Sequence, residues 1–148
     1  MAKAHVFAVR VYYEDTDAAG IVYHASYLRF AERARTEMLR AAGLPPSELL
    51  EREGRMFIVR RCAVDFVRPA RLDDALEVHT SVTEARGARV AAEQIVRRGA
   101  DEIARLRLEI ACVDREGRPA RLPKALDGAF PGPAAQGHGA GAFVTTER

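Results

Sequence analysis

Several features are scarce or missing from this chain, and each absence excludes a class of protein. No apolar run approaches the roughly 20 residues that a helix needs to cross a bilayer, so no membrane span is expected. The first residues, MAKAHVFAVRVYY, contain no apolar segment followed by a small-residue cleavage site, so we expect no signal peptide and a cytoplasmic location. A net charge of only +2 argues against general binding of nucleic acid.

Cysteine and lysine are both rare. The two cysteines, Cys62 and Cys112, each lie in an apolar alternating run, so we expect buried free thiols rather than a disulfide. Neither has the neighbouring Cys or His of a metal site, and we expect no metal and no cofactor. Because Lys3 and Lys124 are the only lysines, nearly all basic residues are arginines, which can bind phosphate through two N–H groups at once.

The apolar pattern predicts one α+β domain. Residues 5–13 alternate as a strand, and Ser26–Ala42 carry apolar side chains at helical spacing, with Ser26 as the expected N-cap and Gly43 as the expected stop. Residues 44–54 are expected to form a loop with one further helical turn. One long helix on a five-stranded antiparallel sheet fits this order, with four strand-like runs after the loop, at 56–70, 75–85, 88–98 and 102–114.

Residues 56–67 are apolar on both faces of the predicted strand. One helix covers only one face of a sheet, so such a strand needs a second cover or a partner chain, and we expect self-association. By contrast, the tail 128–148 is rich in Gly, Ala and Pro without any period, and is expected to be disordered.

Three carboxylates lie just ahead of the predicted helix, and turn or cap chemistry alone can explain any one of them. We interpret Glu14 and Asp15 as turn formers. Asp17, Gly20 and His24 lie within eight residues, where a helix start offers free N–H groups to an oxyanion. Gly20 permits close approach of a ligand, while Asp17 and His24 supply a carboxylate and a proton carrier. This set suits acyl transfer or dehydration beside a carbonyl, and spacing does not decide between them.

One stretch, RVYYEDTDAAGIVYHASYLRFAERARTEMLR at Arg10–Arg40, resembles the opening of the hotdog-fold acyl-CoA thioesterases. The resemblance is strongest to the Tol–Pal-associated (YbgC-type) group within the 4-hydroxybenzoyl-CoA thioesterase family, and it extends to Phe57–Thr80 and Arg121–Leu126. It implies a hotdog domain over residues 1–127, in which the sheet wraps around a long central helix. It also implies hydrolysis of acyl-CoA, with coenzyme A as part of the substrate, at a dimer interface, and dimers that commonly pair into tetramers.

The resemblance implies roles for individual residues. Asp17 corresponds to the catalytic carboxylate, either as a nucleophile that forms a mixed anhydride or as a general base on water. His24 corresponds to the backbone N–H that contacts the oxyanion, and its side chain is typical of the YbgC-type group. Tyr13 matches a tyrosine often placed at the same site. Glu32 and Arg35 also match, and we expect them to form a helix ion pair or to pack.

Substrate contacts are expected from two parts of the chain. Gly20, Val22 and Tyr23 lie within the stretch that carries the resemblance, beside the catalytic residues. The CoA phosphates need cations, and the turn ARGAR favours Arg86 and Arg89, because a turn between strands places two guanidinium groups at a sheet edge.

The acyl preference is left open by the sequence, since short, long and aromatic chains all remain candidates. Phe57, Val59, Phe66 and Tyr27 are interpreted either as the lining of an acyl tunnel or as core residues.

Two other functions compete with hydrolysis. One is a hotdog dehydratase or hydratase acting on 3-hydroxyacyl thioesters, which pairs a His with an acid in a different local context. The other is a non-catalytic adaptor that binds acyl carrier protein, an acidic partner that a basic face would suit.

Overall fold

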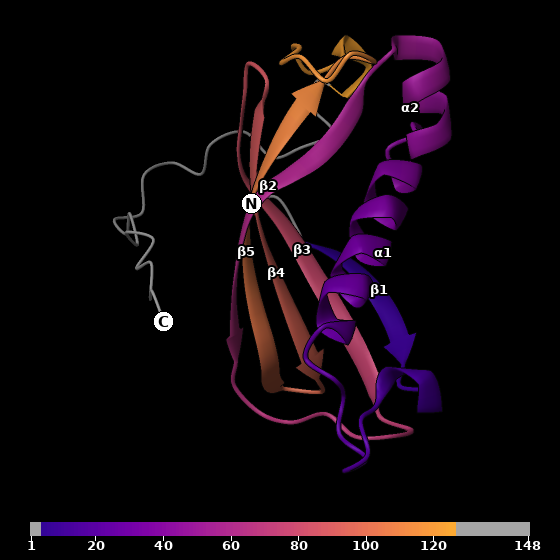
Figure 1. The fold of residues 1–148 in the computed structure, drawn as a ribbon, viewed down its shortest axis with the longest axis vertical. Helices are drawn as coiled ribbons and strands as arrows, with labels where there is room; N and C mark the ends of the chain where they lie inside the picture. The colour runs from indigo at the N-terminus through magenta and orange to yellow at the C-terminus, as the bar shows by residue number, and fades with distance from the viewer. Residues whose placement is uncertain (1–3, 127–148) are drawn as a thin grey trace.

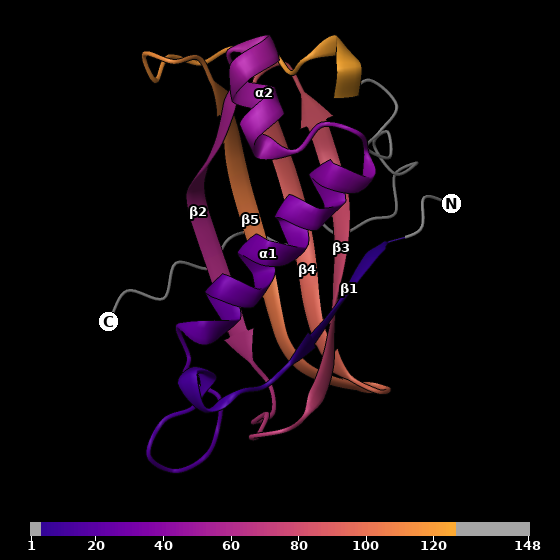
Figure 2. The ribbon, with the colours of Figure 1, turned by 90° about the vertical axis from the view of Figure 1, so that its right-hand side faces the viewer.

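One long helix, α1 (Ser26–Ala41), lies across one face of a five-stranded antiparallel sheet (Figures 1 and 2). The computed structural model describes residues 4–126, so the predicted domain end at 127 and the predicted disordered tail 128–148 lie outside the described residues. The predicted α+β hotdog arrangement is confirmed. The strands follow the spatial order β1-β3-β4-β5-β2, with β1 at His5–Arg10, β2 at Met56–Phe66, β3 at Ala75–Arg86, β4 at Arg89–Arg98 and β5 at Asp101–Val113.

The face of α1 that points at the sheet is the apolar face expected from the sequence. Phe30 is fully buried, and small alanines on the same face let the helix lie close to the strands. Leu39 turns away from this main core and joins a second, smaller one. The buried residues of α1 are Ser26, Tyr27, Phe30, Ala31, Ala34 and Leu39.

The start of α1 differs from the prediction by one residue. Ala25 is the N-cap, and Ser26 is the first helical residue. The hydroxyl of Ser26 donates to the carbonyl oxygen of Asp15 (3.1 Å), so it ties the helix to the preceding turn instead of capping the helix's own N–H groups. Gly43 follows the helix with φ of +82°, which confirms the predicted stop.

Residues 44–54 hold more helix than expected, because α2 (Pro46–Glu53) has eight residues. Pro46 occupies the first helical position, where its fixed φ favours a helix, and Gly54 ends the helix with φ of +62°. Among the described residues, neither α1 nor α2 has the length and the hydropathy needed to cross a membrane. The second core gathers beneath α2 and contains Leu39, Leu44, Leu49 and Leu126.

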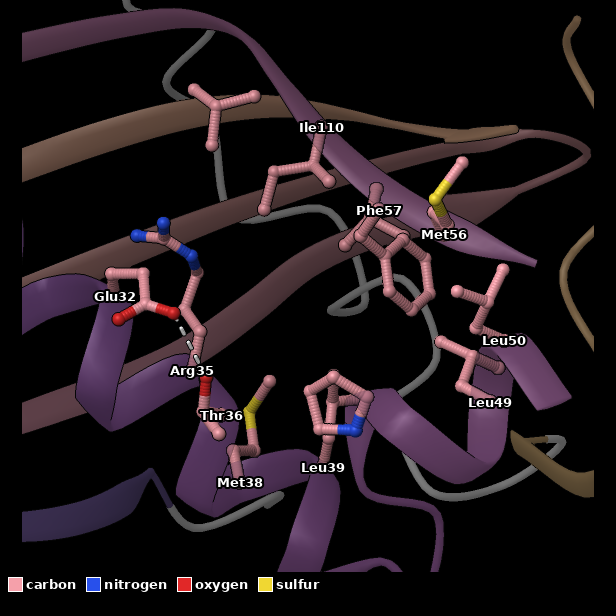
Figure 3. Close-up of a pocket in the computed structure, with 13 residues that line it drawn as sticks. Glu32, Arg35, Thr36, Met38, Leu39, Leu49, Leu50, Met56, Phe57 and Ile110 are labelled. Carbon is pink, nitrogen blue, oxygen red and sulfur yellow. Dashed lines mark hydrogen bonds between the residues drawn. The ribbon is translucent and has the colours of Figure 1, made fainter. Parts of the chain in front are cut away.

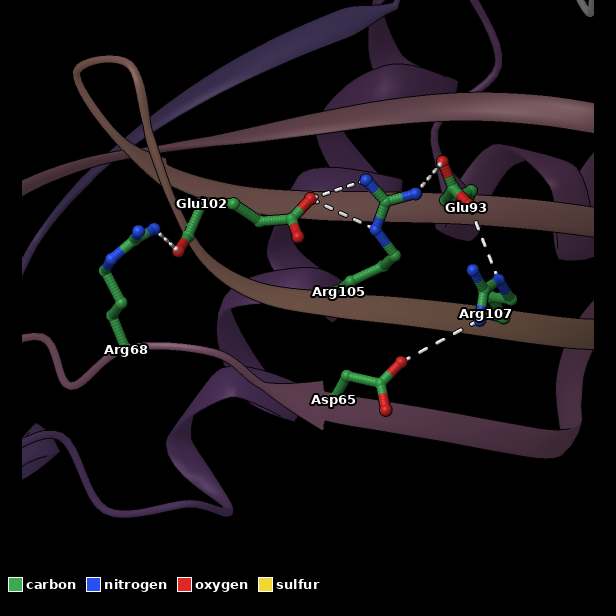
Figure 4. Close-up of polar contacts among 6 residues, drawn as sticks. All are labelled: Asp65, Arg68, Glu93, Glu102, Arg105 and Arg107. Atoms are coloured by element: carbon green, nitrogen blue, oxygen red, sulfur yellow. Dashed lines mark hydrogen bonds and ion pairs between the residues drawn. The ribbon is translucent and has the colours of Figure 1, made fainter. Parts of the chain in front are cut away.

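The face of the sheet opposite α1 carries a network of charges that crosses several strands (Figure 4). The guanidinium of Arg105 lies between Glu93 (3.3 Å) and Glu102, and that of Arg107 between Glu93 (3.6 Å) and Asp65 (3.8 Å). The hydrogen bond from Arg105 holds the pKa of Glu102 below its ordinary value. The pairs of this network that join different strands contribute about 0.2–1 kcal/mol each.

The edge strand β2 exposes large apolar side chains. Ile58, Val59 and Phe66 are 47%, 45% and 54% exposed. The expectation that both thiols are buried is wrong for Cys62, which is exposed, because in the described chain nothing covers this part of β2. Cys112 is buried as expected, and both thiols are free.

Candidate active site

The segment between β1 and α1 is fixed by backbone hydrogen bonds to the β2–β3 loop, residues 67–74. The N–H of Val22 donates to the carbonyl of Ala70 (2.8 Å), and the N–H of Leu72 donates to the carbonyl of Gly20 (3.3 Å). These bonds do not depend on side-chain identity. They hold the turn that carries Asp17 in place against the end of the sheet.

Asp15 is the buried acid of the three, only 5% exposed. Its carboxylate accepts a hydrogen bond from the N–H of Tyr12 (2.8 Å). Its carbonyl accepts from the N–H of Tyr23 (2.9 Å) and from the hydroxyl of Ser26 (3.1 Å). Asp15 is thus a turn former, as the sequence predicted, and it is buried, whereas Glu14 is exposed.

Asp17 lies at the exposed tip of a tight turn. The turn is closed by hydrogen bonds from Gly20 N–H to Asp17 O (3.0 Å) and from Asp17 N–H to Ile21 O (2.9 Å). One carboxylate oxygen, Oδ1, accepts from the N–H of Ala19 (2.9 Å), and the other accepts no hydrogen bond from the described residues. Gly20 has φ of +77° with open space where a Cβ would stand, so the backbone conformation selects glycine here.

His24 lies in the turn that leads into α1, with an exposed side chain. Its ring centroid lies 4.4 Å from that of Tyr23 and 6.3 Å from that of Phe66, edge to face. Within residues 4–126, the backbone N–H groups of His24 and Ala25 donate to no backbone or side-chain acceptor. Free N–H groups at the positive end of a 16-residue helix suit a carbonyl oxygen that gains negative charge.

Phe66 connects this turn to the end of β2. Its ring lies 5.7 Å from that of Tyr27, and its side chain is half exposed beside His24. Tyr27 is buried, its hydroxyl accepts a hydrogen bond from the N–H of Ala70 (3.3 Å), and burial raises its pKa. Of the two alternatives left open by the sequence, Tyr27 is a core residue and Phe66 is accessible to a ligand.

The remaining predicted site residues are spread over the molecule. Tyr13, in the short 3-10 turn Tyr13–Asp15, is 83% exposed, and the side chain of Val22 is buried in the main core. Arg86 and Arg89 are exposed in the β3–β4 turn, at the end of the sheet opposite the Asp17 turn (Figure 2). Because β3 has 12 residues, the two ends lie roughly 40 Å apart.

An ion pair between Asp74 and Arg98 stabilises the β2–β3 loop, which is bonded to the segment that carries Asp17. The carboxylate of Asp74 accepts from the N–H of Arg71 (2.8 Å) and from the guanidinium of Arg98 (2.8 Å). Burial by itself would raise the pKa of Asp74, but these two bonds outweigh it and hold the pKa below its ordinary value. Asp74 therefore remains a carboxylate that ties the loop to β4.

A cavity of about 340 Å³ lies at the other end of β2, between α1, α2 and the first residues of the strand (Figure 3). Glu32, Arg35 and Thr36 form one side of it, and the hydroxyl of Thr36 donates to Glu32 (3.2 Å). The rest of the wall is largely apolar and includes Leu39, Leu49, Leu50, Met56, Phe57 and Val59.

Arg35 is held in the cavity wall by a buried amide. Its guanidinium donates to Oε1 of Gln94 (2.9 Å), while Nε2 of Gln94 donates to the carbonyl of Ala31 and the hydroxyl of Thr80, both at 2.9 Å. Burial lowers the pKa of Arg35. Among the described residues Arg35 forms no ion pair, so it packs instead of pairing with Glu32. Sequence reasoning missed Gln94, although a glutamine in an otherwise apolar alternation was a visible signal.

The segment between β1 and α1 contains two features that suit acyl chemistry. A carboxylate oxygen without a partner can act as a base or a nucleophile, and free N–H groups can stabilise an oxyanion. Within residues 4–126, no three side chains of His, Cys, Asp or Glu gather in a way that would hold a metal ion.

The chain is similar in sequence and in fold to known thioesterases. The model of the thioesterase-like superfamily matches residues 11–130. The chain is 46% identical over 125 residues to "Acyl-CoA thioesterase YbgC" of Haemophilus influenzae, which covers 84% of this chain and 92% of that protein. A "Probable Thioesterase" from Bartonella henselae has a similar structure (TM-score 0.77, 40% identity, 81% of this chain and 99% of that one). So does a 1,4-dihydroxy-2-naphthoyl-CoA thioesterase from Synechocystis (TM-score 0.79, 25% identity, 86% and 95%).

Proposed function

The chain belongs to the thioesterase-like superfamily and is an acyl-CoA thioesterase of the YbgC type, and from this premise we propose that Asp17 performs the hydrolysis. The observation that carries the proposal is the free carboxylate oxygen of Asp17, exposed on a turn whose backbone is fixed just ahead of α1. The substrate carbonyl accepts a hydrogen bond from the N–H of His24, and the carboxylate of Asp17 acts either as the nucleophile or as the general base on water.

Two versions of the step remain open. In the first, an oxygen of Asp17 attacks the thioester carbon, the C–S bond breaks, and water then hydrolyses the mixed anhydride. In the second, Asp17 removes a proton from a water molecule, and that water attacks the carbon. In both, water is added, the CoA sulfur leaves and takes a proton, and the products are a free acid and CoA.

The thioester carbonyl is already reactive, because the sulfur donates its lone pair poorly into the carbonyl group. The protein therefore has to supply few catalytic groups. The main requirement is stabilisation of the charge that develops on the oxygen, and free N–H groups at the start of α1 supply it. The exposed imidazole of His24, beside Tyr23 and Phe66, is the proton carrier for the leaving sulfur. Tyr13, Gly20 and Val22 remain predicted neighbours of the substrate.

The experiment compares acyl-CoA substrates of graded length on the wild type, Asp17→Asn and Glu14→Gln, with a thiol reagent to follow free CoA. Glu14 is the matched control, because it is an exposed acid three residues before Asp17, in the neighbouring 3-10 turn. We expect Asp17→Asn to lower kcat about 10²–10⁴-fold for every substrate, and Glu14→Gln to retain activity.

Other outcomes would replace the proposal. An enoyl product with the thioester intact would assign dehydration. Full cellular function of Asp17→Asn, without hydrolysis, would assign an adaptor for acyl carrier protein. The cytoplasmic location, the assembly as a dimer or tetramer and the role of Arg86 and Arg89 at the CoA phosphates stay predictions.

A further inference from the structure

The first two residues of α1, Ser26 and Tyr27, each bury a hydroxyl group near the Asp17 turn. Their exposed fractions are only 2% and 4%. A buried hydroxyl is costly unless it has a hydrogen-bond partner, so a partner for each is expected within the fold. Both partners are backbone groups of the segments that surround the Asp17 turn, and neither belongs to α1 itself.

The hydroxyl of Ser26 binds the backbone that precedes the turn. It donates to the carbonyl of Asp15 (3.1 Å), two residues ahead of Asp17. The same carbonyl accepts from the N–H of Tyr23 (2.9 Å), and the carboxylate of Asp15 accepts from the N–H of Tyr12 (2.8 Å). Asp15 therefore joins the segment after β1 to the start of α1, and Ser26 supplies one of the two bonds to its carbonyl.

The hydroxyl of Tyr27 binds the backbone that supports the other side of the turn. Its oxygen accepts from the N–H of Ala70 (3.3 Å), and the carbonyl of Ala70 accepts from the N–H of Val22 (2.8 Å). Ala70 is fully buried, and among the described residues its N–H has no acceptor besides Tyr27. The ring of Tyr27 packs against Phe30 and Phe66, with centroids 6.1 and 5.7 Å away, which fixes the place of its hydroxyl.

The backbone bonds between the Asp17 turn and the β2–β3 loop do not fix either of them relative to α1. In the part of the chain that the structure describes, the bond from Ala70 to Tyr27 is the one hydrogen bond that joins this loop to α1. Hydrolysis needs the carboxylate and the helix N–H groups at the same carbonyl, and a misplacement of about 1 Å can lower a rate about 10²-fold.

We propose that the hydroxyls of Tyr27 and Ser26 position the carboxylate of Asp17 relative to the free N–H groups at the start of α1. This inference rests on the proposed function of Asp17 and adds two residues that act through it. Tyr27 has the larger effect, because the N–H that it binds has no second acceptor. Ser26 has the smaller one, because the carbonyl of Asp15 keeps its backbone donor when the hydroxyl is removed.

The first test removes one oxygen atom. Tyr27→Phe keeps the ring and its packing, and its matched control is Tyr12→Phe, whose hydroxyl lies on a side chain that is 62% exposed. The faster of acetyl-CoA and decanoyl-CoA serves as the substrate. We expect Tyr27→Phe to lower kcat about 10–100-fold with KM within about twofold of the wild type, and Tyr12→Phe to change neither.

Ser26→Ala is a milder variant of the same kind. It should lower kcat about two- to fivefold, again with little change in KM. Its matched control is Ser47→Ala, which removes the hydroxyl of an exposed serine in the first turn of α2 and should leave kcat unchanged. For every variant, a urea unfolding curve shows that the protein is folded under the conditions of the assay.

The second test separates positioning from general damage to the fold. Tyr27→Phe is combined with Asp17→Asn, and the single-turnover rates of the wild type, both single variants and the double variant form a double-mutant cycle. If Tyr27 acts by placing the carboxylate of Asp17, its hydroxyl has nothing to place once that carboxylate is gone. Tyr27→Phe should then slow the Asp17→Asn protein by less than about twofold.

Each contrary result has one meaning. Slowing by the same factor with and without Asp17, no slowing of the folded Tyr27→Phe protein, or a raised KM at unchanged kcat would overturn the inference and leave the proposed function standing. If Tyr27→Phe does not fold, the same cycle with Ser26→Ala decides in the same way. Full activity of Asp17→Asn would instead refute the proposed function.

Discussion

The two ends of β2 differ in what holds their neighbours in place. At the Phe66 end, backbone hydrogen bonds such as Val22 N–H to Ala70 O fix the Asp17 turn. At the Met56 end, apolar side chains of α1, α2 and β2 surround a cavity. The buried amide of Gln94 orients the guanidinium of Arg35 in the wall of this cavity. A site fixed by backbone tolerates changes of side chain, whereas the volume of a cavity changes with every substitution in its wall.

This difference suggests a division of work. In the proposed function, the reacting group Asp17 lies at the end of β2 where the backbone fixes the geometry, whereas the cavity lies at the end where side chains determine the shape.

The first prediction concerns the exposed edge of β2, where the sequence predicts self-association. Val59→Arg places a charge on the exposed edge of β2 and should weaken dimerisation by about 2–4 kcal/mol, the range of a central interface residue. Sedimentation at graded concentrations measures this loss. Val6→Arg on the other edge strand is the matched control, and equal dimerisation of both variants would contradict the assignment of β2.

The cavity end is tested by removing its buried amide. Gln94→Leu leaves the guanidinium of Arg35, the carbonyl of Ala31 and the hydroxyl of Thr80 without their partner, and should destabilise the protein by about 1–3 kcal/mol. Urea unfolding measures the change. Thr83→Ala, which removes an exposed hydrogen bond on the same sheet, should cost far less, and equal losses would show that the network adds nothing.

The catalytic end is tested through pH, with the smallest expected effect. Since the pKa of Asp74 is lower in the folded protein, its carboxylate stabilises the fold fully above its unfolded pKa of about 3.9, and this stability is lost as pH falls through the folded pKa. Asp74→Asn should cost about 1 kcal/mol at neutral pH.

Unfolding of the wild type and Asp74→Asn, followed from pH 7 into acid, should give stabilities that converge as the pH falls through the lowered pKa of Asp74 in the folded protein. A constant difference across this range would show that the ion pair with Arg98 does not carry the effect.

Local pattern predicted much of this molecule. The spacing of the apolar residues predicted α1 and the strands, and Gly43 correctly predicted the end of α1. The same kind of signal was present for α2, with Pro46 at its start and Gly54 after its end, but only one helical turn was expected there.

Other features depend on long-range packing. Cys62 belongs to an apolar run, and its exposure follows from the position of β2 at the edge of the sheet. Asp15 and Asp17 are two residues apart and chemically alike, and only the folded turn shows that one is buried and bonded while the other is exposed. The cavity arises from three elements that no single stretch of sequence describes.

The most direct test of the account is the rate of a single turnover, with enzyme in excess over decanoyl-CoA, for Asp17→Asn beside Glu14→Gln. If the free oxygen of Asp17 acts on the thioester, CoA release by Asp17→Asn slows by about 10²–10⁴-fold while its unfolding midpoint in urea stays close to the wild type. Release of CoA at the wild-type rate by folded Asp17→Asn would contradict the central claim.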